Sequence, residues 1–220
     1  MKILILIIIL IPSICIAQVD EKVTPISELE YKDSLWHNKK SSSIFTGTYI
    51  IFFDSNQVKE RGHIENGLLN GHCIQFHKNG NKKKEFYAVN GKLDGIAKGW
   101  YENGQMEFIR IFKDGIKSGP TTEWYDNGQI STKGFFKNDQ LDKRVIQYYK
   151  NGNPKTYMIL KDGEVDSTLT KYYPNGQVEY KRNYENGVLH GKSYSMDSLG
   201  NIYSKIKYKK GKIVKVKIND

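Results

Sequence analysis

Residues 95–118 read GIAKGWYENGQMEFIRIFKDGIKS, and this stretch decides the fold. Its dipeptides Asn103-Gly104 and Asp114-Gly115 strongly favour type I′ turns, because both central residues of that turn need a positive φ. The segments beside the first turn have the length of strands and are rich in apolar and aromatic residues. The stretch therefore predicts one antiparallel β-hairpin.

The same pattern recurs along the chain every 24 residues. Glycine opens most units, and Lys143 and Ser167 stand in its place in two of them. Seven units follow one another from Gly47 to Val214 without insertion or deletion. Two turn columns complete the pattern: Asn56, Gly80, Gly104, Gly128, Gly152, Gly176 and Gly200, and Gly67, Gly91, Gly115, Asp139, Gly163, Gly187 and Gly211. A strict period of this length is the signature of a repeat protein.

These units predict an all-β fold, an elongated antiparallel meander of about seven β-hairpin repeats and about fourteen strands. We expect four regions: a signal peptide over 1–17, a tether and a decayed half repeat over 18–46, the seven repeats over 47–214 and a basic tail over 215–220. Within the second region, 31–36 resembles half a unit and is expected to cap the array, because terminal repeats must cover an open edge.

The first residues indicate export. Lys2 precedes an apolar run that is too short to span a bilayer, and small residues at Cys15 and Ala17 fit cleavage between Ala17 and Gln18. A lipoprotein signal needs a small residue where Ile14 stands, so we favour cleavage over an anchor on Cys15. The sequence predicts a periplasmic, cell-surface or secreted protein.

Two aromatic rows repeat at neighbouring positions of the unit. The row Phe52, Phe76, Trp100, Trp124, Tyr148 and Tyr172 is expected to be buried, and the row one residue later must face the other way, because side chains alternate along a strand. This second row either holds the repeats together or lines a shallow groove for a ligand. Its candidate partner-binding residues are Tyr101, Tyr125, Tyr149 and Tyr173.

The net positive charge of the chain favours an anionic partner. The chain has 34 Lys and Arg against 24 Asp and Glu, a formal net charge of +10. Lysines alternate with apolar residues from Lys205 to Ile218 and either discourage edge-to-edge aggregation or attract an anionic or membrane surface. An exported protein rarely meets nucleic acid and no binding motif is present, so we expect no nucleic-acid partner.

Residues that carry chemistry are sparse. The five histidines do not have the spacing of a metal site, and His63 with Cys73 would supply only two ligands. There is no Gly-x-Ser-x-Gly motif and no phosphate-binding loop before a helix. Acidic residues recur mainly beside turns, where turn chemistry explains them. We expect no catalytic residue, no metal and no cofactor, and so no enzyme.

The repeated motif resembles a known family. Residues 100–106, 124–130 and 172–178 share two aromatic residues, then Asn-Gly-Gln and an apolar residue, and this unit is similar to the bacterial variant of the MORN repeat. Similar bacterial proteins are described as YwqK-type antitoxins of toxin–antitoxin systems. The resemblance implies a hairpin array, and the chain departs from the tighter eukaryotic MORN pattern.

Two functions are compatible with these observations. The first is an exported, non-catalytic binding or scaffold module for a protein or an envelope glycan. The second, implied by the resemblance, is an antitoxin or immunity-type protein that neutralises a toxin. The signal peptide favours the first, because an intracellular antitoxin has no need of export.

Overall fold

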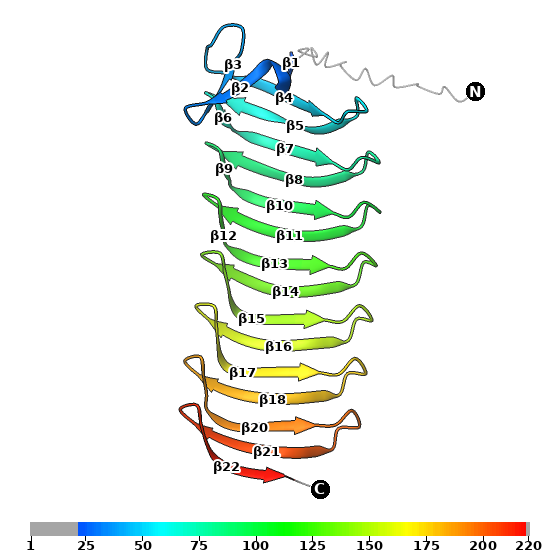
Figure 1. Cartoon of the computed structure of the whole chain (residues 1–220), viewed down its shortest axis with the longest axis vertical. Coiled ribbons are helices and arrows are strands. Elements are labelled where there is room, and N and C mark those ends of the chain that lie inside the picture. Colours follow the sequence, from blue (N-terminus) through cyan, green and yellow to red (C-terminus); the bar gives the residue numbers. More distant parts are fainter. Residues whose placement is uncertain (1–21, 219–220) are drawn as a thin grey trace, which may run out of the picture.

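The computed structural model describes residues 22–218, and every regular element in this range except one short 3-10 helix is a β-strand. Figure 1 shows the strands stacked in chain order along one long axis. The N-terminal elements are β1 (Val23–Pro25), η1 (Ile26–Glu28), β2 (Leu29–Lys32) and β3 (Leu35–Asn38). The repeats contribute β4 (Gly47–Phe52), β5 (Val58–Glu65), β6 (Leu68–Leu69), β7 (Gly71–Phe76), β8 (Lys82–Val89), β9 (Lys92–Leu93), β10 (Gly95–Trp100), β11 (Met106–Lys113), β12 (Ile116–Lys117), β13 (Gly119–Trp124), β14 (Ile130–Lys137), β15 (Gln140–Tyr148), β16 (Pro154–Lys161), β17 (Glu164–Tyr172), β18 (Val178–Glu185), β19 (Val188–Leu189), β20 (Gly191–Met196), β21 (Ile202–Lys209) and β22 (Lys212–Ile218).

The fold class is confirmed. From β4 to β22 each long strand pairs antiparallel with the next, so one sheet runs through all seven repeats. The meander has one parallel addition: β1 pairs with β4, with Thr24 opposite Tyr49. The sequence pattern did not predict this pair, because β1 lies outside the repeated unit.

In most repeats the chain bends between a two-residue strand and a six-residue strand. Gly71 makes this bend with φ 89°, and Gly119 makes it with φ 91°. Lys143 and Ser167 hold the same left-handed conformation, with φ 59° and 85°, although both carry a side chain. At these two positions the short and long pieces run on as the continuous strands β15 and β17. The column therefore demands a positive φ whichever residue occupies it.

The core follows a column that the sequence analysis did not single out. The third residue of nearly every unit is buried; we name this set the core column: Tyr49, Cys73, Ala97, Thr121, Val145 and Ser193. Ile64, Ala88 and Leu160 share a second position of the unit and are also buried. Two glycines lie opposite large aromatic residues in this layer: Gly62 opposite Tyr49 and Gly99 opposite Phe108.

The aromatic row expected to be buried is only half-buried. Phe52 is 45% exposed, and Trp100 and Trp124 are of intermediate exposure. The physical reason is a shift of register at this position, where Trp100 pairs with Met106 directly after Gly99 pairs with Phe108. Such a bulge bends the strand beside the turn and lifts its last side chain from the packed interior.

The N-terminal segment caps the first repeat. Strands β2 and β3 form their own hairpin, in which Tyr31 lies opposite Trp36. The backbone N–H of Trp36 donates a hydrogen bond to the carbonyl oxygen of Gly67, and Leu29 is buried against Tyr49. The expected half repeat is thus a separate hairpin docked on the array.

Of the two expected end regions, only the C-terminal one lies largely within the described residues. The signal peptide over 1–17, Cys15 and the Ala17-Gln18 cleavage site lie outside the described residues. The expected basic tail begins inside β22, which continues to Ile218. Over 22–218 the structure contains no helix with the length and apolar character needed to cross a membrane.

Candidate functional site

The tyrosine row joins each repeat to the next. The hydroxyls of Tyr101, Tyr125 and Tyr149 each donate a hydrogen bond of 2.7 Å to a backbone carbonyl oxygen 23 residues further on, and Tyr173 does so at 3.0 Å. His77 occupies the same position one repeat earlier, and its Nε2 lies 2.7 Å from the carbonyl oxygen of Trp100. Burial raises the pKa of Tyr101 and Tyr173. The structure therefore brings the four predicted tyrosines into one ladder, with every hydroxyl already donating within the sheet.

The asparagines of the same turns form a parallel ladder. The Nδ2 of Asn103 donates to the carbonyl oxygen of Asp126 at 2.7 Å, and its Oδ1 accepts the backbone N–H of Gln105 at 3.0 Å. The same pair of contacts recurs from Asn79, Asn127, Asn151 and Asn175. One asparagine thus shapes its own turn and fixes the next.

A second surface row lies on the opposite face from the core column. His72, Ile96 and Pro120 each precede a core-column residue by one position, so alternation turns them to the other side. Their cross-strand partners are Tyr87, Ile111 and Phe135. We name the apolar members the outer stripe: Tyr87, Ile96, Ile111, Pro120 and Phe135.

The outer stripe is open to solvent at Tyr87, Ile96 and Pro120, and its other two members are half-buried. Tyr87 is 52% exposed and Ile96 is 51% exposed, and the ring of His72 stacks on Tyr87 with 4.9 Å between centroids. Contiguous exposed apolar side chains on a folded surface mark interaction sites. Sequence reasoning missed this row, although its positions also recur every 24 residues, because the residue type there changes from His72 to Ile96 to Pro120.

The core face holds a polar cluster whose groups are already satisfied. The hydroxyl of Tyr49 donates to Glu60 at 2.5 Å, and Gln75 donates to the other carboxylate oxygen of Glu60 at 2.9 Å. Burial, followed by the contact with Glu60, raises the pKa of Tyr49 well above its usual range. Burial also raises the pKa of the Cys73 thiol to about 11. This arrangement keeps the phenol and the thiol protonated and so provides no nucleophile at neutral pH.

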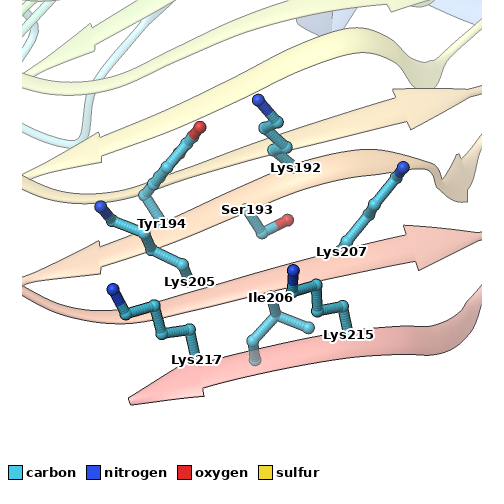
Figure 2. A pocket seen from close by; sticks show the side chains of 8 residues that line it. All are labelled: Lys192, Ser193, Tyr194, Lys205, Ile206, Lys207, Lys215 and Lys217. Atoms are coloured by element: carbon cyan, nitrogen blue, oxygen red, sulfur yellow. The ribbon is translucent and has the colours of Figure 1, made fainter. Parts of the chain in front are cut away.

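Lysines gather at the C-terminal end of the sheet. Figure 2 shows Lys192, Lys205, Lys207, Lys215 and Lys217 around a shallow hollow of about 310 Å³, which Tyr194, Ser193 and Ile206 also line. The pairs Lys205–Lys217 and Lys207–Lys215 lie directly opposite each other on neighbouring strands. We name the five lysines and Tyr194 the lysine face.

Three of the repeats match a known family of sequence repeats. A match to the MORN repeat variant covers residues 93–114, 117–138 and 166–186. These three units are similar to the MORN repeat variant. Each matched segment contains a strand pair, a residue of positive φ at the bend described above, and a ladder tyrosine and asparagine. No curated protein matches the chain. The match supports the resemblance to the MORN repeat at these three units, and the expected antitoxin relationship stays a prediction.

The repeat array offers no evident metal-binding cluster in the part of the chain that the structure describes. Over residues 22–218 no three His, Cys, Asp or Glu side chains come together in a way that could hold a metal ion. The carboxylates of Asp94, Asp142 and Asp166 accept hydrogen bonds from backbone N–H groups 20 residues further on, so they link neighbouring repeats. MORN repeats are generally binding or scaffold modules.

Proposed function

We propose that this chain is an exported, non-catalytic binding and scaffold module, whose outer stripe docks a protein partner. The observation that carries the proposal is the exposure of Tyr87 and Ile96 on a sheet whose repeats are fastened to one another. A stiff surface loses little conformational entropy on binding, so exposed apolar side chains on it contribute efficiently to affinity.

Photo-crosslinking tests this role. A benzophenone amino acid at Ile96 should form a covalent product with one partner, and the same group at Ile116 should not. Ile116 is the matched control because it is an isoleucine of similar exposure, 44% against 51%, at a turn outside the stripe. The same products from both positions would contradict docking on the stripe.

A substitution gives the complementary evidence. Ile96→Asp places a charge in the stripe and should abolish crosslinking from a benzophenone at Tyr87, because burying an unpaired carboxylate at an interface is costly. The melting temperature should change little, because Ile96 is half exposed. Mass spectrometry of the product identifies the partner and shows whether it is a toxin.

The tyrosine row is a second candidate contact, for a glycan or a protein. The hydroxyls of Tyr101, Tyr125, Tyr149 and Tyr173 are engaged as donors, so a ligand would use the ring surfaces and the remaining lone pairs. Tyr125→Phe retains the ring and separates ring contacts from the hydroxyl. Glycan-array binding that persists in Tyr125→Phe and is lost in Tyr125→Leu would support ring stacking.

Export is part of the same proposal and has its own test. Expression of the full chain with N-terminal sequencing of the mature product should give Gln18 as the first residue. Recovery of the uncleaved chain in the cytoplasm would contradict export and leave the docking proposal unaffected.

A further inference from the structure

The two edge strands of the sheet differ in how far they are covered by other parts of the described chain. At the first edge β1 pairs with β4, and the β2–β3 hairpin covers part of the same end. At the other edge β22 pairs with β21, and within residues 22–218 no strand pairs with its outer side. The outward N–H and C=O groups of an edge strand are a ready template for another strand.

The side chains of β22 divide by face. Lys215 and Lys217 lie opposite Lys207 and Lys205, on the lysine face. Val216 and Ile218 lie opposite Ile206 and Ser204, on the other side, and are 50% and 70% exposed. The strand therefore presents positive charge to one side and apolar surface to the other.

Edge protection accounts for only part of this charge. A lysine on an edge strand discourages aggregation, which explains Lys215 and Lys217. Lys192, Lys205 and Lys207 lie on the inner strands β20 and β21, where they protect no edge. None of the five lysines forms an ion pair with an acid within the described residues.

We propose that β22 accepts an added β-strand from a partner protein, an extended segment in which acidic and apolar residues alternate. Its backbone would pair with the open edge, its carboxylates would face Lys215 and Lys217, and its apolar side chains would cover Val216 and Ile218. The edge of β22 is separate from the outer stripe. The inference rests on the proposed function in one respect, namely that the chain binds a protein partner.

Charge decides between this occupant and two others. A second copy of β22 would bring lysines opposite lysines, and like charges directly opposite destabilise a strand pair. A membrane surface would use the lysines and leave the edge N–H groups unpaired. An acidic strand satisfies the charge, the apolar side and the backbone together.

A synthetic peptide tests the proposal with the full chain. The probe is a fluorescein-labelled octapeptide of alternating Glu and Val, and its binding is followed by fluorescence anisotropy at low salt. It should bind at least tenfold more tightly than a Lys-Val octapeptide and than a peptide with four Glu followed by four Val. Equal binding of the alternating and the block peptide would overturn the proposal.

N-methylated peptides test the backbone pairing. An added strand uses the N–H groups along one of its edges, so methylating alternate amides of the Glu-Val octapeptide should abolish binding in one register and spare it in the other. Similar affinities for the two methylated peptides would overturn strand addition, since simple charge attraction does not distinguish them.

Variants locate the site. Lys215→Glu with Lys217→Glu should weaken peptide binding at least tenfold, whereas Lys39→Glu with Lys40→Glu, which changes net charge equally at the far end, should not. Equal loss in both variants would overturn the site. Two other results would also overturn the proposal. One is a dimer in sedimentation velocity that the double variant Lys215→Glu with Lys217→Glu dissociates. The other is binding to phosphatidylserine vesicles that the Glu-Val peptide does not displace. Crosslinking from Ile96 is independent of all these outcomes.

Discussion

The hydroxyl of Tyr125 donates a 2.7 Å hydrogen bond to the backbone carbonyl oxygen of Tyr148, which belongs to the next repeat. The tyrosine that follows Tyr148 makes the same contact one repeat further on. A side chain at one turn therefore fixes the end of the next strand pair, and the contact is passed along the array. This relationship gives the aromatic pair beside each turn a structural role.

Replacing Tyr125 with Phe removes this hydrogen bond and leaves the ring in place. We expect the free energy of unfolding to fall by about 1 kcal/mol, because the backbone carbonyl oxygen of the half-buried residue Tyr148 loses this donor. Urea denaturation followed by circular dichroism measures the change. Tyr203→Phe is the control, since Tyr203 is 48% exposed and lies outside the ladder. An unchanged midpoint for Tyr125→Phe would contradict the stapling role.

Gly99 has no room for a side chain. A Cβ atom there would overlap the ring of Phe108, which lies opposite on β11. Gly99→Ala should therefore destabilise the protein by about 1–3 kcal/mol, and Phe108→Leu in the same chain should restore part of the loss. Thermal melts of the three variants test this coupling; strictly additive losses would argue against the overlap.

Gly80 provides the contrasting case of backbone strain. It has φ 87°, and no heavy atom lies within 4 Å of the place that a Cβ atom would occupy, so Gly80→Ala tests conformation without overlap. Its cost should be about 1 kcal/mol, and Phe108→Leu should not relieve it. Thermal melts of Gly80→Ala with and without the second substitution provide the comparison.

Ser167 occupies the bend column in a conformation that suits glycine. Ser167→Gly should raise the free energy of unfolding by about 0.5–1 kcal/mol. The change relieves the strain of a left-handed backbone in the folded state, and the greater entropy of glycine in the unfolded chain offsets part of this gain. The reverse change, Gly119→Ser, should lower it by about 1–2 kcal/mol, because φ is 91° there and Ile111 lies 3.3 Å from the new Cβ. Chemical denaturation of both variants checks the opposite signs.

Alkaline pH should destabilise the fold through Cys73 and Tyr49. Burial raises the pKa of Cys73 from 9.0 to about 11, and it raises the pKa of Tyr49 further. The folded state then holds these protons when the unfolded state has lost them, so the free energy of unfolding falls as pH rises through 9 to 11.

Urea denaturation at about pH 8 and about pH 10.5 measures this loss. Cys73→Ala should show a smaller fall between the two values, whatever its stability at the lower pH. An identical fall in the parent and in Cys73→Ala would show that the thiol does not contribute. The parent thiol should also react slowly with thiol reagents until the protein unfolds, because Cys73 is 0% exposed.

Deleting residues 95–118 should leave a folded, shorter protein. Gly119 would follow Asp94, and His77 would meet the carbonyl oxygen of Trp124 in place of that of Trp100, so every type of contact between repeats is retained. Deleting 95–106 instead removes one strand and should unfold the array. Circular dichroism distinguishes the two, and equal loss of strand signal would contradict independent repeats.

The fold could be predicted because its information is local. Each Asn-Gly or Asp-Gly turn sets the register of its own hairpin, and a constant spacing carries that register through the array. The interior could not be assigned in the same way. A bulge beside each turn shifts the register between Gly99 and Trp100, so alternation counted from the turn misplaced the aromatic row.

The candidate site was predicted in part for a related reason. The position of Tyr101 and its equivalents as one row followed from the period, but the carbonyl oxygens that they reach depend on how neighbouring turns stack. The parallel pairing of β1 depends on a contact with a segment that shares no repeat pattern. The lysines gather because the register of β20, β21 and β22 sets them opposite one another, and this requires the pairing of three strands to be known.

The uninterrupted 24-residue period has a consequence for distance. Each unit adds two strands, and strands lie about 4.8 Å apart, so one unit lengthens the sheet by about 9.6 Å. Gain or loss of whole units would therefore change the separation between the capped first edge and β22 in fixed steps, without altering either end. The array is in effect a molecular ruler whose graduations are its turns.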